Sequence, residues 1–344
     1  MTEDKQHRQL RKAMQLRIHD ALLGEVYTTP KPGLVDLHDN GAHRDMDVHT
    51  FERSTAAITP FLSRMFEQGY CARPYQEAGQ PQDDCTEAER LFLSIRRTGI
   101  EAEQAMLRAT GGVNTHKGML FSMGIALAAY GNMLQVLPPA ADGSSAAQEP
   151  SSSSCTHPLR AVPAESVLET AGRMTARILT AEFEQMQHSV PKTYGERLFR
   201  RFGERGIRGQ AIEGFPILRY TALPAIRRYT AYALERTGGA ALPPTLLNAV
   251  RLNTLLAVMA KLNDTNVLSR SNPETMLLLR QRAAKILAAG GAFREEGLSA
   301  LSILNQECIR RNISPGGAAD MLAVAILLHG LEQEIGDMEG DSNA

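Results

Sequence analysis

Acids, bases and amides crowd one short stretch of the chain, from Glu25 to Asp47, that no requirement of core packing explains. Pro30, Pro32 and Gly33 prevent a helix from running through it. Polar side chains on a stiff, irregular segment between helices are typical of a scaffold that presents chemistry. The candidates of this opening loop are Glu25, Lys31, Asp36, His38, Asp39, His43, Asp45 and Asp47. Two alternatives stay open, a transition-metal site on the two histidines and a simple helix cap at one of the last two aspartates.

A second polar segment, from Gly111 to Gly118, precedes an apolar helix. Asn114 or Thr115 can cap that helix, so Lys117 falls in its first turn, where a cation opposes the helix dipole. Free backbone N–H groups, glycines that allow close approach and a lysine together predict a phosphate site. The spacing is not that of a P-loop, and the alternative is an exposed lysine at an ordinary helix start.

The segment from Ser314 to Asp320 repeats this arrangement with a carboxylate added. Gly316 and Gly317 fall in the first turn of a helix, where each lowers helix stability by up to about 1 kcal/mol relative to alanine. Such glycines are expected where a ligand or another helix must approach the backbone. Asp320 lies one turn further along an otherwise apolar helix, so it needs a cationic partner: a metal ion, or an arginine if the glycines only pack helices.

The tetrapeptide from Asn263 to Asn266 separates two periodic segments. Four small polar residues in a row are also what an ordinary turn contains. The functional alternative is a cluster of hard oxygen ligands for Mg²⁺ or for ribose hydroxyls, with Arg270 nearby for a phosphate.

Five arginines crowd the stretch from Tyr194 to Phe215. Arg197, Arg200 and Arg201 are expected on a solvated helix face. Arg205 and Arg208 are expected in a loop, because glycines flank them, and arginine is suited to bidentate phosphate contacts. The sequence does not support a hydrolase with a Ser-His-Asp or Cys-His site, because no serine or cysteine lies in a motif typical of a catalytic nucleophile.

The elements that must position these groups all show helical periodicity, and no run alternates for long enough to predict a strand. We predict an all-α protein, a single-domain multi-helix bundle over 1–344 with functional loops between its helices. The predicted helices are 8–24, one containing Phe51 to Met65, 86–109, 115–136, 164–186, 192–203, 216–236, 244–262, 273–289, 297–311 and 315–335.

Composition narrows the function classes. The formal net charge of −1 argues against a general nucleic-acid binder, so any polyanionic ligand must be met by locally gathered Lys and Arg. The four cysteines show no metal-type pairing and indicate free thiols in a reducing compartment. The charged N-terminus is not a signal peptide, and the apolar run from Met119 to Leu137 is expected to be a buried helix rather than a membrane span. We expect a cytoplasmic protein with no membrane association.

One segment, 138–163, is rich in Pro, Ala, Ser and Gly and has too little apolar surface to offset its ordering entropy. We predict a disordered surface insertion there rather than a domain boundary, because the candidate site motifs occur on both sides of it.

The separated motifs together resemble the triphosphoribosyl-dephospho-CoA synthase family, which makes the prosthetic-group precursor of citrate lyase. The matching pieces are Glu25, 29–36, 41–46, 112–118, 206–209, 263–266 and 312–320. The resemblance implies a pentosyltransferase. ATP loses adenine, and its triphosphoribosyl group passes to the 2′-hydroxyl of 3′-dephospho-CoA, with Mg²⁺ accompanying the triphosphate. It also implies a functional link to a citrate lyase acyl carrier protein and its holo-transferase.

This reaction assigns roles to the candidates. The predicted catalytic residues are Asp36, His43, Asp45 and Asp264. The predicted substrate and phosphate ligands are Lys31, Asn114, Thr115, His116, Lys117, Arg205, Arg208, Asn263, Asn266, Ser314, Gly316 and Gly317. The predicted metal ligands are Asp264 and Asp320, for Mg²⁺.

One position departs from the expected pattern, because Gln210 stands where the family leads us to expect Glu, and Glu213 could compensate. Three alternatives to the citrate lyase assignment remain. They are the same reaction serving malonate decarboxylase, a Mg²⁺-dependent helical hydrolase of nucleotides or ADP-ribose groups, and a non-catalytic helical adaptor.

Overall fold

The computed structural model describes residues 3–73, 85–135, 159–191 and 193–333. Thirteen α-helices and no strand occur in these parts of the chain, which confirms the predicted all-α class. The α-helices are α1 (Glu3–Val26), α2 (Val48–Cys71), α3 (Glu87–Ala109), α4 (Lys117–Leu134), α5 (Ala164–His188), α6 (Tyr194–Phe202), α7 (Gly206–Ile212), α8 (Leu223–Arg236), α9 (Pro244–Met259), α10 (Thr265–Arg270), α11 (Pro273–Ala288), α12 (Glu295–Arg310) and α13 (Gly316–Glu332). A π-helical turn, η1 (Leu218–Ala222), precedes α8, and a 3-10 turn, η2 (Gly291–Phe293), precedes α12.

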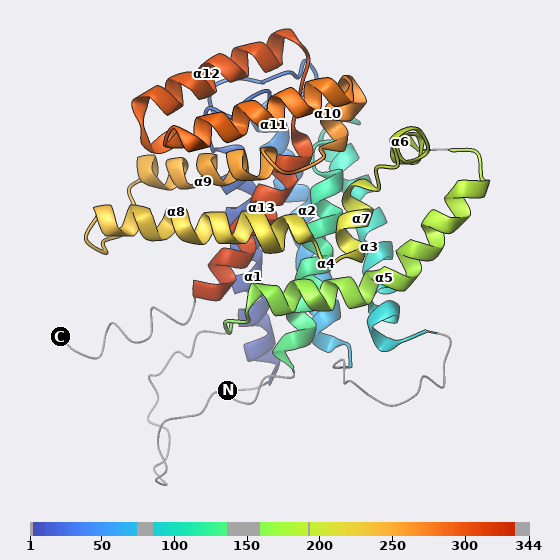
Figure 1. The fold of residues 1–344 in the computed structure, drawn as a ribbon. Helices are drawn as coiled ribbons and strands as arrows, with labels where there is room; N and C mark the ends of the chain where they lie inside the picture. Colours follow the sequence, from blue (N-terminus) through green and yellow to red (C-terminus); the bar gives the residue numbers. More distant parts are fainter. Residues whose placement is uncertain (1–2, 74–84, 136–158, 192, 334–344) are drawn as a thin grey trace, which may run out of the picture.

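Two helices, α4 and α13, form the interior of the bundle (Figure 1). Both are apolar on nearly every side, so neither can face water along its length. α4 packs closely on α2, because Gly69 of α2 lies against the backbone of Ala128 and a Cβ at Gly69 would come within 2.0 Å of that carbonyl oxygen. On one side of the molecule α8, α9, α11 and α12 are stacked in that order (Figure 1).

The apolar run that begins at Met119 is a buried core helix as far as the structure describes it, to Gln135. Within the described ranges, no helix is both long and apolar enough to cross a membrane.

Local signals decide where several helices begin. Asp47 caps α2 in a capping box with Thr50, so of the two aspartates considered for this role Asp47 takes it. Thr86 and Glu89 form a second capping box at the start of α3. Asn272 caps α11 directly before Pro273.

Two predicted loops are helical. Arg208 lies within the short helix α7 rather than in a loop, and Arg205 is the residue before it. The tetrapeptide from Asn263 to Asn266 is the start of α10, capped by Asp264. Periodicity could not reveal either helix, because seven and six residues are too few to show an apolar stripe.

Most of the predicted insertion lies outside the described residues. Its last five residues, 159–163, are described, and Leu159 and Val162 among them are buried in the core. These five residues therefore belong to the folded domain, and the predicted boundary at 163 is too late.

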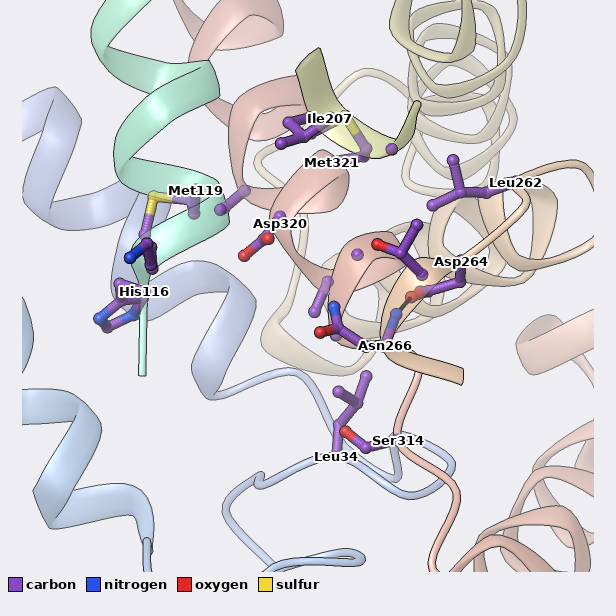
Figure 2. Close-up of a pocket in the computed structure, with 18 of the residues that line it drawn as sticks. Leu34, His116, Met119, Ile207, Leu262, Asp264, Asn266, Ser314, Asp320 and Met321 are labelled. Atoms are coloured by element: carbon purple, nitrogen blue, oxygen red, sulfur yellow. Dashed lines mark hydrogen bonds between the residues drawn. The ribbon is translucent and has the colours of Figure 1, made fainter. Parts of the chain in front are cut away.

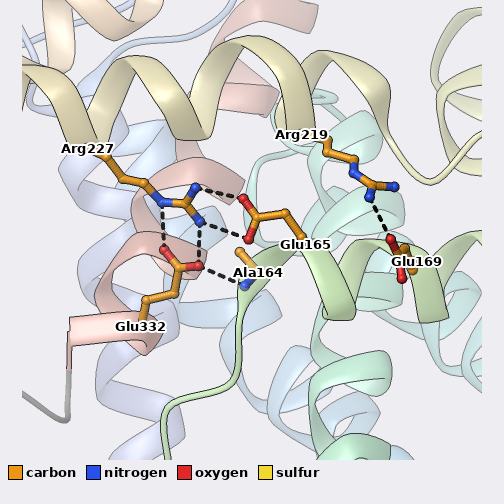
Figure 3. A network of polar contacts seen from close by, with 6 residues as sticks. All are labelled: Ala164, Glu165, Glu169, Arg219, Arg227 and Glu332. Atoms are coloured by element: carbon orange, nitrogen blue, oxygen red, sulfur yellow. Dashed lines mark hydrogen bonds and ion pairs between the residues drawn. The ribbon is translucent and has the colours of Figure 1, made fainter.

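An ionic cluster joins three helices far apart in the sequence (Figure 3). Arg227 of α8 donates to both carboxylate oxygens of Glu165, at the start of α5, and of Glu332, at the end of α13. Glu332 also accepts from the backbone N–H of Ala164 at 2.7 Å. The two carboxylates raise the pKa of Arg227, and Arg227 lowers that of Glu165. The cluster holds the ends of α5 and α13 against α8.

Candidate active site

A cavity of about 960 Å³ opens where the starts of α4, α7, α10 and α13 meet the opening loop. Ligand sites in proteins commonly have this size. The cavity gathers most of the predicted site residues from segments far apart in the chain (Figure 2). Those that line it are Lys31, His43, Asn114, Thr115, His116, Lys117, Arg208, Asn263, Asp264, Asn266, Ser314, Gly316, Gly317 and Asp320.

Three predicted residues do not line the cavity. Asp36 is buried, and its carboxylate accepts hydrogen bonds from the backbone N–H groups of Lys31, His38 and Asp39 at 2.7, 2.7 and 3.1 Å. It shapes the opening loop, and both of its oxygens accept hydrogen bonds from the backbone. Asp45 is largely exposed, and Arg205 lies over the ring of Phe183 at 5.7 Å from its centroid. The structure therefore brings neither of these to the cavity.

Lys31 is buried at the wall of the cavity and forms an ion pair with Glu25, which is buried as well. Its ammonium also donates to the backbone carbonyl of Glu25 at 2.8 Å. A lysine held this way adds positive charge to the cavity wall, but it is less free to follow a ligand than an exposed one. This pair also explains why Glu25 belongs among the site residues.

Asp264 joins the starts of two helices. One carboxylate oxygen accepts from the backbone N–H of Asn266 in α10 at 2.8 Å, and the other accepts from that of Ala318 in α13 at 2.9 Å. Burial raises its pKa to about 6, although these N–H groups oppose the shift. A Cβ at Gly317 would come within 3.0 Å of this carboxylate, so the predicted cradle at the start of α13 already holds an anion from the protein itself.

Asp320 is the carboxylate that lacks such partners. It faces the cavity one turn into α13, and in Figure 2 its oxygens point into the space between His116 and Asn266. No residue in the described parts of the chain hydrogen-bonds to it or forms an ion pair with it. Burial, and then the nearby charges of Asp264 and Glu25, raise its pKa well above the usual range. A cation beside Asp320 would reverse this effect.

The start of α4 lies directly against Asp320. A Cβ at Gly118 would come within 2.3 Å of one Asp320 oxygen, so a larger residue would push the carboxylate aside. The first-turn N–H groups of Gly118 and Met119 have no intrahelical partner, and no side chain of the described residues caps them. The N–H of Lys117 is taken by Asn114 at 3.2 Å.

His116 lines the same part of the cavity and is buried. Thr115 donates to Ser54 at 2.7 Å, and Ser54 lies 2.6 Å from Nδ1 of His116. If the Ser54 hydroxyl donates a hydrogen bond to Nδ1, that nitrogen is the acceptor and the ring proton is on Nε2, which has no partner within the described structure. Burial, and then the charge of Lys31, lower the pKa of His116 to about 3, so the ring is neutral near pH 7.

His43 connects the opening loop to the end of α10 and to the segment that precedes α13. Its Nε2 lies 2.9 Å from Ser314 Oγ, and its Nδ1 lies 3.4 Å from the guanidinium of Arg270. Burial, and then Arg270, lower the pKa of His43, while Asp45 opposes this. Of the predicted acid–base groups of the opening loop, His43 is the one that reaches the cavity.

Cations surround the cavity on several sides. Lys117 forms an ion pair with Glu103 at 2.5 Å and is 60% exposed, and Arg208 lies 3.7 Å from Glu182. Three more cavity-lining cations, Lys261, Arg270 and Arg280, come from the segment after α9 and from α10 and α11. Lys261 and Arg280 are not among the predicted site residues, because helical spacing alone does not distinguish a cavity-facing cation from one on a solvated face.

The structure also places Gln210 and Glu213, the residues considered for the expected carboxylate. Gln210 lines the cavity, but its side chain accepts from the backbone N–H of Ile217 at 3.0 Å. Glu213 is exposed and is not part of the cavity wall, so it does not replace the missing carboxylate.

The described residues contain no cluster of three or more histidine, cysteine or carboxylate side chains that could hold a metal ion. The transition-metal alternative on His38 and His43 therefore finds no ligand set. Of the two carboxylates predicted for Mg²⁺, Asp264 has both oxygens bound to backbone N–H groups, whereas Asp320 is open. One open carboxylate fits Mg²⁺ when the substrate phosphates supply further ligands.

The chain is similar to known proteins over most of its length. The model of the ATP:dephospho-CoA triphosphoribosyl transferase (CitG) family matches residues 11–338. A probable 2-(5''-triphosphoribosyl)-3'-dephosphocoenzyme-A synthase of Vibrio cholerae serotype O1 (strain M66-2) is 35% identical over 319 residues, 92% of this chain and 87% of the relative. The 2-(5''-triphosphoribosyl)-3'-dephosphocoenzyme-A synthase of Escherichia fergusonii is 34% identical over 311 residues, 90% of this chain and 88% of the relative.

No solved structure matches this chain. The family match extends over nearly all of the described fold, including every segment that lines the cavity. The chain belongs to the ATP:dephospho-CoA triphosphoribosyl transferase family, whose reaction moves the triphosphoribosyl group of ATP to dephospho-CoA.

Proposed function

We propose that this chain performs the family reaction in the 960 Å³ cavity, with the reacting ribose beside Asp320. One observation carries this assignment. Asp320 is a carboxylate without a partner among the described residues, at the junction of two helix starts, in a cavity whose wall also carries several lysines and arginines. An enzyme that binds a polyphosphate and stabilises positive charge developing on a sugar needs both cations and a nearby carboxylate.

The triphosphate of ATP lies, in this proposal, at the start of α4. The N–H groups of Gly118 and Met119 are available there. Lys117 can leave its exposed ion pair with Glu103 and bind a phosphate oxygen instead. Arg208, Lys261, Arg270 and Arg280 are the further cations of the cavity wall that can meet phosphate oxygens of the two substrates.

Mg²⁺ is part of the proposal. Asp320 would hold the ion together with phosphate oxygens, and the ion would neutralise part of the charge of the triphosphate. Asp264 supports this site indirectly, since it fixes the starts of α10 and α13.

The chemistry breaks the bond between C1 of the ATP ribose and the adenine nitrogen, and it forms a bond between that carbon and the 2′-oxygen of dephospho-CoA. The acceptor hydroxyl loses one proton and the departing adenine gains one, so the reaction is balanced. The carboxylate of Asp320 stabilises the positive charge that develops on the ribose. His116 donates a hydrogen bond from Nε2 to the departing base, and His43, held by Ser314, is the assigned proton acceptor.

The client of the product is proposed to be citrate lyase, through its acyl carrier protein and a holo-transferase. The alternative client is malonate decarboxylase. The genes beside the one that encodes this chain test this choice, because subunits of one client enzyme are expected there. The reaction uses ATP and dephospho-CoA, so we place the protein in the cytoplasm.

The decisive experiment measures free adenine and the coupled product by mass spectrometry, with ATP and Mg²⁺, in the presence and absence of dephospho-CoA. Wild-type protein should release adenine only when dephospho-CoA is present. The Asp320→Asn variant should lose most turnover, and Asp20→Asn is the matched control because Asp20 is exposed and outside the cavity. Adenine or ribose phosphate formed equally well without dephospho-CoA would instead support the hydrolase alternative.

A further inference from the structure

Three phenyl or phenol rings line the cavity: Phe51, Phe121 and Tyr220. Two of these rings are already packed. Phe51 lies edge-on to His116 with centroids 4.9 Å apart, and Phe121 lies edge-on to Phe92 at 6.4 Å. Tyr220 is 70% exposed, and among the described residues no second aromatic ring contacts it. Tyr220 is therefore the cavity-lining ring with a face open to a ligand.

The backbone that carries Tyr220 is unusual. Tyr220 lies in the π-helical turn η1, a geometry that is rare and frequently found at functional sites. The turn follows Phe215, a fully buried residue with a φ of +54°, in the left-handed region that most side chains avoid. Gln210 of α7 supports the start of this segment through the backbone N–H of Ile217. An exposed aromatic ring therefore lies at the cavity wall on a backbone segment whose π-helical turn and positive φ are energetically unfavourable.

Arg219 occupies one face of the ring. Its guanidinium carbon lies 5.4 Å from the ring centroid, and Glu169 of α5 anchors the same guanidinium at 2.6 Å. A planar ring held by a cation on one side and open on the other suits an aromatic base, since stacking on such a ring needs no particular hydrogen-bond pattern.

Both substrates of the proposed function carry adenine, and the two bases have different fates. The adenine of ATP leaves, so it must lie at the reacting ribose, in the part of the cavity formed by Asp320, Gly118 and His116. The adenine of dephospho-CoA is chemically unchanged and departs within the product. It needs a separate place on the cavity wall, and Tyr220 reaches that wall from η1, a different element from the α4 and α13 that carry Gly118 and Asp320.

We propose that Tyr220 stacks on the adenine of dephospho-CoA and positions its ribose 2′-hydroxyl toward the ATP ribose. Arg208 and Gln210 of α7 line the same cavity and can meet the polar groups of that nucleotide. The inference rests on the proposed function, because it requires two adenine nucleotides in one cavity.

The test measures the KM for dephospho-CoA at saturating ATP, and the KM for ATP at saturating dephospho-CoA, by adenine release. Tyr220→Ala should raise the first about 5- to 150-fold, the range expected for loss of one base–aromatic contact, and leave the second within about twofold. Tyr220→Phe should behave like wild type, and Tyr220→Leu should behave like the alanine variant. Tyr232→Ala is the control, since Tyr232 is exposed on α8 and does not line the cavity.

A rise in the KM for ATP instead would mean that the ring contacts ATP, and this would overturn the inference. Unchanged KM values for both substrates in Tyr220→Ala would overturn it as well. Full activity in Tyr220→Leu would show that an apolar side chain without a ring is sufficient, and that Tyr220 does not act by stacking on the base. In each of these results wild-type protein still makes the product, so the proposed function stands. Wild-type protein that released no adenine with both substrates present would contradict the proposed function itself.

Discussion

His116 should make the protein sensitive to mild acid. The unfolded chain binds a proton on this side chain near the ordinary pKa of 6.5, whereas the folded protein does so only near pH 3. The unfolded state therefore binds more protons than the folded state between these values, and stability is lost as the pH falls below about 6.5. Since each pKa unit corresponds to about 1.4 kcal/mol, lowering the pH from about 7.5 to about 5 should remove about 2 kcal/mol through this residue.

Asp264 acts in the opposite direction. Burial raises its pKa from 3.8 to about 6, so its charge is unfavourable in the folded protein near pH 7.5 and this penalty is partly relieved on acidification. The relief over the same interval is about 1.4 kcal/mol, comparable with the loss through His116. The pH dependence of the wild-type protein alone would therefore conceal both effects.

A comparison of variants separates them. His116→Asn removes the titrating ring and keeps a polar atom near Ser54, which contacts Nδ1 in the wild-type protein. Urea unfolding at about pH 7.5 and about pH 5 should show that the variant loses about 2 kcal/mol less stability than wild type across the interval. His49→Asn is the control, because His49 is exposed on α2, and it should follow the wild type.

Equal pH dependence in His116→Asn and wild type would refute the burial argument for His116. The same variant should also release adenine more slowly, since the Nε2 donor assigned to the departing base is gone. Normal turnover combined with a flattened pH dependence would leave the burial intact and remove His116 from the chemistry.

Three further outcomes follow from the contacts. Asp320→Asn should raise the melting temperature without ligand, because it removes a half-buried carboxylate that has no partner among the described residues, and should slow adenine release about 100-fold or more. Lys117→Ala should change the unfolding free energy by less than about 1 kcal/mol, because its ion pair is exposed, while raising the KM for ATP about tenfold in a steady-state assay. Arg227→Ala should lower the unfolding free energy by about 1–3 kcal/mol in urea titrations, because Glu165 and Glu332 lose their shared partner, and should leave the KM values near wild type. An Asp320→Asn protein that melts earlier, a Lys117→Ala protein that loses several kcal/mol, or an Arg227→Ala protein of unchanged stability would each contradict the corresponding contact.

The sequence alone determined the fold class and most of the helices. Long helices such as α3 and α5 carry enough periodic apolar positions to be read directly, and caps such as Asn272 before Pro273 mark where others begin. The order of the polar motifs was also sufficient to indicate the family, which the comparison with known proteins confirmed. These features are local, because each depends on residues within a few turns of one another.

Which polar groups remain open to a ligand was decided by the tertiary structure. The sequence does not distinguish the roles of Asp36, Asp264 and Asp320. In the structure the carboxylates of Asp36 and Asp264 accept hydrogen bonds from backbone N–H groups, whereas that of Asp320 faces the cavity without a partner among the described residues. In the same way, Ser54 of α2 orients His116 from 62 residues away. Hydrogen-bond partners and burial depend on segments brought together by packing, and a linear pattern contains no information on which donor will meet which acceptor.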